Sequence, residues 1–397
     1  MDRYLQPEFV VFGLTLCGVA IFHRHALAAA IAGVVVTVGF KLATLGLSTG
    51  GAWFATLIGH EWNTWINVLT VLLGFAVIAN HFERSGLADV LPRLLPRNWT
   101  GGLALLGVVF ALSIFLDNIA ASIIGGIIAR HYYRDAVSTA FLAAIVAAAN
   151  AGGAGSVLGD TTTTMMWISG IPAFDVLPAF VASLAAFAFF APLAALHQAK
   201  RASGCSSAAN VTRVSWTRTV VVAVLLVSVI AINALGNALS PALYQTAPWL
   251  GVGLWITIGL TALWRKPNWN SVSHALPGAF FLTALVALAA MMPVEGLPPP
   301  SWQTVLGLGF LSAVFDNIPL TALALKQGGY DWSLLAYAVG FGGSMMWFGS
   351  SAGVALSSDF PQVRSVVGWV RGGWFIPIAY LAGFFVLFFI AGWRAGS

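Results

Sequence analysis

The chain has 397 residues, of which 59% are hydrophobic and only 8% are charged. A soluble globular domain has about a quarter charged residues, so this composition, with a mean hydropathy of +0.88, excludes that class and indicates a helical protein with many membrane spans. The net charge of +5 comes from basic residues scattered through short loops. We therefore expect the lipid bilayer, and no nucleic acid, as a partner.

Apolar stretches long enough to cross a bilayer are distributed along the whole chain. Two further apolar stretches, 103–130 and 302–327, carry an Asp-Asn-Ile motif, and we interpret each as a helical hairpin that enters and leaves the membrane on one side. Two ordinary spans, each with a buried Asp, are the alternative. The ten expected spans are 9–22, 26–47, 63–82, 137–170, 176–196, 217–238, 249–265, 274–293, 332–358 and 373–393.

The distribution of basic residues favours the hairpin interpretation. With both hairpins in place, only Arg3, Lys41, Lys326 and Arg394 of the 18 Lys and Arg residues fall on one face, and the others share the opposite face. An excess of Lys and Arg is typical of cytoplasmic loops. We therefore expect a multi-pass protein of the inner (plasma) membrane with both termini on the non-cytoplasmic side.

The two halves of the chain show the same order of expected elements. Residues 1–196 give three spans, a hairpin and two spans, and residues 217–397 repeat this order in the opposite orientation. The expected fold is an all-α inverted-topology repeat with five spans and one re-entrant hairpin in each copy. Residues 197–216 are polar, Ser-rich and basic, and are expected to form a cytoplasmic linker.

Both hairpins carry an acidic residue within an apolar frame. The first contains Asp117 and Asn118, and the second contains Asp316 and Asn317. A charged side chain at the centre of a bilayer costs roughly 3 kcal/mol on insertion scales, so an acid in this position indicates a functional site. Its occurrence in matching frames suggests one half-site in each repeat.

A glycine-rich break interrupts the apolar span that follows each hairpin, and the equal spacing of the two breaks places Asp160 opposite Ser350. Unwound backbone at membrane depth needs protein or a water cavity around it, and it frees carbonyl oxygens that could bind a small cation. A packing face of small residues is the alternative, but it does not explain Asp160 or the threonines at 161–164. The glycines expected to form the unwound backbone are Gly152, Gly153, Gly159, Gly342, Gly343 and Gly349.

These segments resemble the signature motifs of NhaD-type sodium/proton antiporters, in the Ion Transporter superfamily that also includes arsenite permeases and dicarboxylate/sodium symporters. The resemblance is carried by Gly159-Asp160-Thr-Thr-Thr-Thr and by Asp316-Asn317-Ile318-Pro319. It implies that a hairpin and a broken helix in each repeat bind sodium, that a transport domain moves against a scaffold as an elevator, and that the protein forms a homodimer.

The resemblance also implies which residues bind the ion. One half-site would consist of Asp117, Asn118, Asp160 and Thr161, with Thr162 beside them, and the other of Asp316, Asn317, Ser350 and Ser351. The first motif has Ala120 where the second has Pro319, so the copies are unequal and the number of bound ions stays open.

The acidic tips favour a cation as the substrate. Asp117, Asp160 and Asp316 are the only acids expected at membrane depth, and no Arg or Lys is expected there to attract an anion. The same oxygens can hold either protons or sodium, and competition between the two yields Na⁺(Li⁺)/H⁺ antiport. We therefore expect a secondary transporter and no enzyme, with these three aspartates coupling Na⁺ to H⁺ and with no cofactor.

Two other functions stay open. An arsenite or anion permease, or a sodium-coupled carboxylate permease, would have the same fold. An intramembrane aspartyl protease also uses paired aspartates, but the Gly-x-Gly-Asp pattern of that family is absent, since Val157 lies three residues before Asp160. The preference among Na⁺, Li⁺ and K⁺, the stoichiometry and the pH range are not indicated by the residues.

Overall fold

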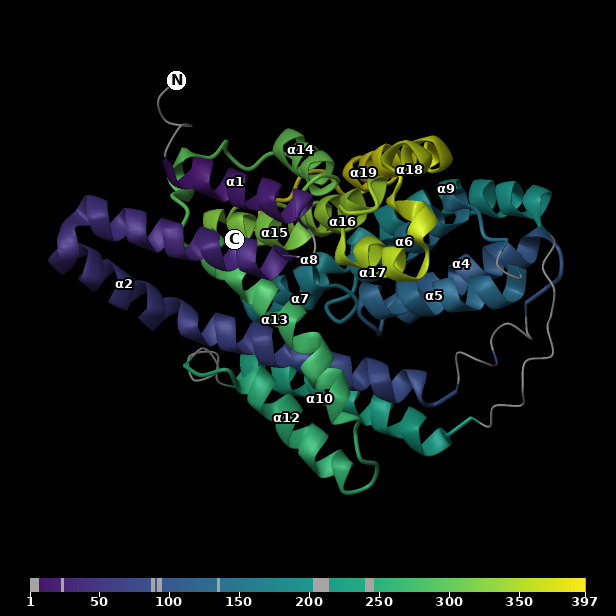
Figure 1. Cartoon of the computed structure of the whole chain (residues 1–397), viewed down its shortest axis with the longest axis horizontal. Helices are drawn as coiled ribbons and strands as arrows, with labels where there is room; N and C mark the ends of the chain where they lie inside the picture. The colour runs from purple at the N-terminus through teal and green to yellow at the C-terminus, as the bar shows by residue number, and fades with distance from the viewer. Residues whose placement is uncertain are drawn as a thin grey trace.

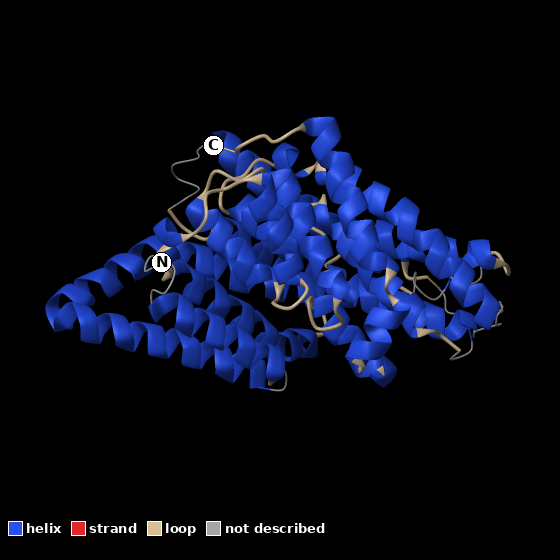
Figure 2. Cartoon of the chain, turned by 90° about the horizontal axis from the view of Figure 1, so that it is seen from above, coloured by secondary structure: helices blue, strands red, loops and turns tan. Residues whose placement is uncertain are grey.

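The computed structural model describes residues 7–22, 25–86, 90, 95–133, 136–202, 214–239 and 246–396. In these ranges all regular elements are helices and no strand occurs (Figure 2). Among the described residues, five helices are long and apolar enough to cross a membrane, or six if the bent pair Val366–Gly372 and Phe375–Ala391 forms one span. The chain is thus an all-helical, multi-pass membrane protein, as its composition predicts. Four of its apolar helices are shorter: Pro7–Val19, Trp99–Ser113, Thr139–Ala154 and Trp249–Ala262.

Helix α2 (Ala26–Glu83) has 58 residues in two arms. It bends at Gly46, whose φ of +75° lies in the left-handed region that glycine adopts without steric cost. The arms fold back toward each other and meet at the left edge of Figure 1. The sequence predicts a loop between the spans 26–47 and 63–82, and this prediction is wrong. Residues 48–62 are helical, because their polar side chains lower the hydropathy without breaking the helix and no proline occurs among them.

Three helices of the second half pack against the longer arm of α2, and we call these four helices the panel. Gly251 N–H donates to Asn67 Oδ1 at 3.0 Å, and Trp255 Nε1–H donates to Thr70 O at 2.9 Å. The panel occupies the lower part of Figure 1. Its other members are α10 (Trp216–Leu239), α12 (Trp249–Ala262) and α13 (Trp269–Ala290), while α1 (Pro7–Ile21) packs on α2 as well.

Two helical hairpins turn at the aspartates of the Asp-Asn-Ile motifs. In the first, Gly125 lies against Val109, and the two are equally far from Asp117 along the chain, so the paired helices are antiparallel. In the second, Gln327 Nε2–H donates to Pro298 O at 2.8 Å, which returns the end of the hairpin to its beginning. The membrane face on which each opens stays a prediction. The hairpin helices are α4 (Trp99–Ser113), α5 (Asn118–Tyr133), α14 (Trp302–Ser312) and α15 (Asn317–Gln327).

Each hairpin is followed by a helix with a break in its middle. The chain leaves the helix after Ala154 and re-enters it where the Asp160 side chain accepts the Thr162 N–H. In the second copy, Ser350 caps the new helix by accepting the Gly353 N–H at 3.4 Å. The pieces are α6 (Thr139–Ala154), α7 (Thr161–Ile168), α16 (Trp332–Gly342), the 3₁₀ turn η3 (Gly343–Met345) and α17 (Ser351–Asp359).

The two pairs of hairpin and broken helix make matching contacts. Ser113 Oγ–H donates to Ala149 O at 2.6 Å, and Ser312 Oγ–H donates to Val339 O at 2.7 Å. Both serines stand four residues before the motif aspartate, and both carbonyls stand three residues before the Gly-Gly pair. The similarity seen in the sequence therefore extends to tertiary contacts.

The remaining helices enclose this central part. Helices α9 and α19 pack against each other and against α6 or α16, so residues 140–154 of α6 are all buried. Of the expected linker 197–216, the first residues continue α9, and 203–213 lie outside the described residues. The other elements are α8 (Ala173–Val176), α9 (Ala179–Arg201), η2 (Val294–Gly296), η4 (Pro361–Arg364), α18 (Val366–Gly372) and α19 (Phe375–Ala391).

Candidate functional site

The tips of both hairpins lie beside the breaks in the helices that follow them. At the first tip, Asn118 N–H donates to Gly159 O at 3.0 Å, and Ser156 Oγ–H donates to Ile114 O at 2.5 Å. At the second, Ser351 Oγ–H donates to Asp316 Oδ2 at 3.0 Å. The two hairpin tips therefore lie at the two helix breaks, inside the protein.

Asp160 is at the centre of this place and is only 2% exposed. Its Oδ2 accepts the Thr162 hydroxyl at 2.8 Å. The amide of Asn118 donates to Oδ1 at 3.4 Å, and the amide of Asn317 donates to Oδ2 at 3.4 Å. One carboxylate is thus contacted by both hairpins. The two half-sites implied by the resemblance are not separate here, because Asn317 of the second lies against Asp160 of the first.

Asn150 connects the two halves, and the sequence analysis did not identify it. Its Oδ1 accepts the Asn118 amide at 3.0 Å, and its Nδ2 donates to Ser344 Oγ at 2.9 Å and to Ser350 Oγ at 3.1 Å. It is a single polar residue in an alanine-rich stretch two positions before the Gly-Gly pair, and that position was the only available signal.

The position equivalent to Asn150 in the second copy is Gly340, two residues before its own Gly-Gly pair. A Cβ at Gly340 would lie 3.0 Å from Asp160 Oδ2. The absence of a side chain at Gly340 thus leaves room for the Asp160 carboxylate to lie against the second repeat. The inequality of the copies extends beyond Ala120 and Pro319.

The other two aspartates flank this centre. Asp117 Oδ1 is buried and, among the described residues, has no hydrogen-bond partner. Asp316 Oδ1 accepts the Ile318 N–H at 3.0 Å. Asp117 and Asp316 each lie close enough to Asp160 for electrostatic interaction, so the three acids predicted from the sequence do come together.

The threonines after Asp160 bind the carbonyls freed by the break. Thr163 Oγ1–H donates to Ser156 O at 2.5 Å, and Thr164 Oγ1–H donates to Val157 O at 2.8 Å. A carbonyl oxygen has two lone pairs. Ser156 O uses both, because it also accepts the Gly159 N–H at 3.2 Å, whereas Val157 O can still accept. Thr161 is buried at the start of α7. The break is therefore a stabilised, defined piece of backbone.

The oxygens available to a cation are those of amides, hydroxyls and backbone carbonyls around the Asp160 carboxylate, with Asp117 and Asp316 beside it. In the described part of the chain, no group of three or more His, Cys, Asp or Glu side chains could hold a metal ion. Such a set suits a weakly bound hard monovalent cation better than a transition metal, which favours imidazole and thiolate ligands.

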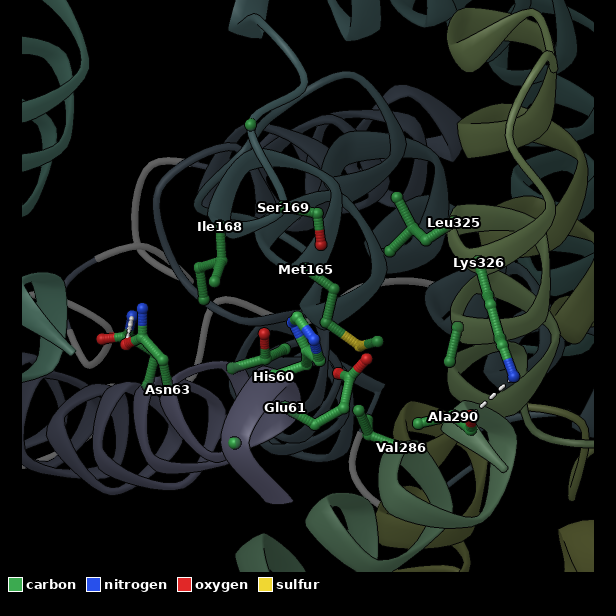
Figure 3. A pocket seen from close by; sticks show the side chains of 15 residues that line it. His60, Glu61, Asn63, Met165, Ile168, Ser169, Val286, Ala290, Leu325 and Lys326 are labelled. Atoms are coloured by element: carbon green, nitrogen blue, oxygen red, sulfur yellow. Dashed lines mark hydrogen bonds between the residues drawn. The ribbon is translucent and has the colours of Figure 1, made fainter. Parts of the chain in front are cut away.

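A cavity of about 530 Å³ lies between α2, α7, α13 and α15, at the ends of α7 and α15 remote from Asp160 (Figure 3). Glu61 and His60 of α2 line one wall, and Lys326 lines the other, with its Nζ donating to Ala290 O at 2.6 Å. Glu61 lies within the apolar arm Ser48–Glu83. The helix thus continues through residues expected to form a loop, and Glu61 belongs to it. That Asp117, Asp160 and Asp316 are the only acids at membrane depth stays a prediction.

Comparison with known proteins gives several relatives, although no family model matches the chain. It is 29% identical over 323 residues to sodium/proton antiporter 1 of Arabidopsis thaliana, covering 69% of this chain and 54% of that protein. It is 28% identical over 328 residues to sodium/proton antiporter 2 of the same plant, covering 72% of this chain and 76% of that protein.

A shorter segment is similar to a bacterial protein. The chain is 31% identical over 109 residues to the Na⁺/H⁺ antiporter NhaD of Alkalimonas amylolytica, covering 26% of this chain and 22% of that protein. The chain spans about half the length of the first plant relative and three quarters of the second.

Proposed function

Since the chain is related to sodium/proton antiporters, NhaD-type proteins among them, we propose that it exchanges Na⁺ for H⁺ across a membrane. The observation that carries this proposal is the contact of one buried carboxylate, Asp160, with an asparagine from each of the two hairpins. Both the names of the relatives and the chemistry of the site support a cation as the substrate.

The charge at the site supports the exclusion of anions. The side chains that contact Asp160 are the amides of Asn118 and Asn317 and the hydroxyl of Thr162, and all three are neutral. A carboxylate or phosphate substrate would meet uncompensated negative charge at this point. A cation or a proton would reduce the cost of burying that charge.

The exchange follows from competition for the same oxygens. In the proposed mechanism Na⁺ binds Asp160 together with oxygens of Asn118, Asn317 and neighbouring hydroxyls, and protonation of the carboxylates displaces it. Rotating an asparagine amide by half a turn about its last torsion replaces an N–H donor with the Oδ1 oxygen that a cation needs. The asparagines can therefore serve the protonated and the sodium-bound forms in turn.

The matching contacts of the two hairpin and broken-helix pairs support an inverted repeat. We propose that these pairs move together as a transport domain while the panel of α2, α10, α12 and α13 remains fixed in the membrane. An elevator motion would then expose Asp160 to each side in turn. By the resemblance to the superfamily, the proposed assembly is a homodimer. The distribution of basic residues supports an inner-membrane location with both termini on the non-cytoplasmic side.

Proteoliposomes containing the full chain and a trapped pH indicator test the proposed function. A Na⁺ pulse should move protons out of the compartment that Na⁺ enters, and the movement should be absent in empty liposomes. Pulses of Li⁺ and K⁺ establish the cation preference. Uptake of arsenite or a dicarboxylate without sodium-driven proton movement would contradict antiport and favour the permease functions.

A further inference from the structure

A second cavity, of about 400 Å³, lies where the hairpin tips, α13 and the beginnings of α2 and α17 meet. Its walls are almost entirely apolar. Asp316 is the only ionisable side chain among its lining residues, and Ser351 is the only hydroxyl. Side chains that form the apolar wall include Leu16, Leu27, Phe281, Leu285, Phe315 and Val354.

The carboxylate in this cavity is fixed in place. The Ile318 N–H holds Oδ1 at 3.0 Å, and the Ser351 hydroxyl holds Oδ2 at 3.0 Å. Both donors are neutral, so the negative charge of an ionised Asp316 is oriented but not cancelled by them. A charge beside an apolar surface is costly unless an opposite charge pairs with it.

The walls and the charge together define the ligand. An inorganic cation alone would satisfy the carboxylate but would leave the apolar walls without contacts, and a neutral apolar molecule would do the reverse. A molecule with an apolar body and one positive charge satisfies both. The volume is within the range of about 300–1,000 Å³ that small-molecule sites have.

We propose that this cavity binds amphipathic monovalent organic cations, such as an aryl- or alkylammonium, with the cationic group on Asp316 and the apolar group against α13 and the hairpin tips. One consequence rests on the proposed function. If Asp316 also takes part in binding Na⁺, the organic cation and Na⁺ compete, and the organic cation inhibits exchange.

Direct binding to the purified full-length protein tests the proposal without any transport measurement. In sodium-free buffer at neutral pH, benzylammonium should bind at least tenfold more tightly than benzyl alcohol, which has nearly the same shape and no charge. Adding Na⁺ should raise the apparent Kd of benzylammonium. Equal binding of the two compounds would show an apolar lipid-facing cavity only, and would overturn the proposal.

A pair of glycine variants locates the binding. Gly278 of α13 lines the cavity and Gly259 of α12 does not, and a Cβ built on either meets no atom within 4 Å. Gly278→Leu should fill the cavity and lower benzylammonium affinity at least tenfold, whereas Gly259→Leu should leave it unchanged. Unchanged binding in Gly278→Leu would place the ligand elsewhere and overturn the proposal.

The two proposals fail separately. Charge-dependent benzylammonium binding without sodium-driven proton movement would support the organic-cation site and contradict antiport. Sodium-driven proton movement without charge-dependent benzylammonium binding would support antiport and contradict the organic-cation site.

Discussion

Asp160 is only 2% exposed, so its ionised carboxylate has a large desolvation cost. Its partners are two amide groups at 3.4 Å, one hydroxyl at 2.8 Å and one backbone N–H at 3.3 Å, and such neutral donors offset only part of the desolvation cost of a carboxylate. Asp117 Oδ1 has no hydrogen-bond partner among the described residues at all. At the scale of single residues, the site is thus arranged so that adding a proton or a cation is favourable.

Replacing Asp117, Asp160 or Asp316 singly by Asn should therefore lower the rate of sodium-driven proton exchange at least tenfold. This corresponds to an increase of about 1.4 kcal/mol in the activation free energy. The amide keeps the size of the side chain but can neither release a proton nor offer a negative charge. Exchange is measured in proteoliposomes, with Asp175→Asn as the control, because Asp175 is an exposed residue of α8. Full activity in two of the three variants would refute their role.

Asn150 provides a second test at this scale. Asn150→Ala removes hydrogen bonds to Asn118, Ser344 and Ser350 and leaves their buried polar groups without these partners. An unsatisfied buried group costs roughly 1–3 kcal/mol, so we expect a lower unfolding temperature and weaker Na⁺ binding, measured by thermal unfolding in detergent and by calorimetry. Asn63→Ala, in helix α2 of the panel, is the control that separates a loss of stability from a loss of Na⁺ binding. If Asn150→Ala bound Na⁺ as tightly as the unchanged protein, Asn150 would have no part in the site.

At the scale of elements, the glycines of the breaks are positioned by contact as well as by flexibility. A Cβ at Gly152 would overlap the carbonyl oxygen of Phe110, and one at Gly342 would overlap that of Gly309. Backbone atoms of a packed hairpin cannot move aside as a side-chain end can. The Gly-Gly pairs thus bring each hairpin into direct contact with its broken helix, and this contact fixes where Asn118 and Asn317 lie.

Gly152→Ala and Gly342→Ala should each destabilise the protein by roughly 1–3 kcal/mol, as insertion of extra atoms into a packed core does. Gly307→Ala in α14 is the matched control, because no atom lies within 4 Å of its built Cβ and alanine favours a helix by about 1 kcal/mol over glycine. Thermal unfolding in detergent measures both effects. A neutral effect of Gly152→Ala and Gly342→Ala would show that the hairpins are loosely packed.

The orientation of the hairpins is a further prediction at this scale. If they open to opposite sides, a cysteine at Arg130 should be labelled from the cytoplasm and one at Lys326 from outside, in a background without Cys17 and Cys205. Arg130 and Lys326 lie near the ends of α5 and α15. Membrane-impermeant maleimide on oriented vesicles reports the side. Labelling of both from one side would rule out the inverted repeat.

At the scale of the whole molecule, local patterns predicted more than tertiary contacts did. The breaks after Ala154 and Gly342 follow from glycines that disfavour a helix, and the hairpin tips follow from the position of Asp117 and Asp316 in apolar frames. The contact of Asn317 with Asp160 joins residues 157 positions apart, and no local pattern encodes it. The helical residues 48–62 were missed because hydropathy reports burial in lipid and not helix formation.

The convergence of both hairpins on one carboxylate also determines how the whole molecule should respond to pH. A protonated aspartate cannot bind Na⁺, so each bound proton disfavours Na⁺ and each bound Na⁺ releases protons. Lowering the pH through the range in which the aspartates take up protons should weaken apparent Na⁺ affinity, by up to about tenfold per pH unit for each proton displaced, or about 1.4 kcal/mol.

Isothermal calorimetry at several pH values measures this affinity, and repeating it in buffers of different ionisation enthalpy counts the protons released. Above that pH range the affinity should become constant, because no proton remains to be displaced. Asp160→Asn should remove most of the pH dependence together with most of the binding. A Na⁺ affinity that is constant at all pH values, without proton release, would contradict competition at one site, and a sodium-coupled solute symporter would then explain the same fold better.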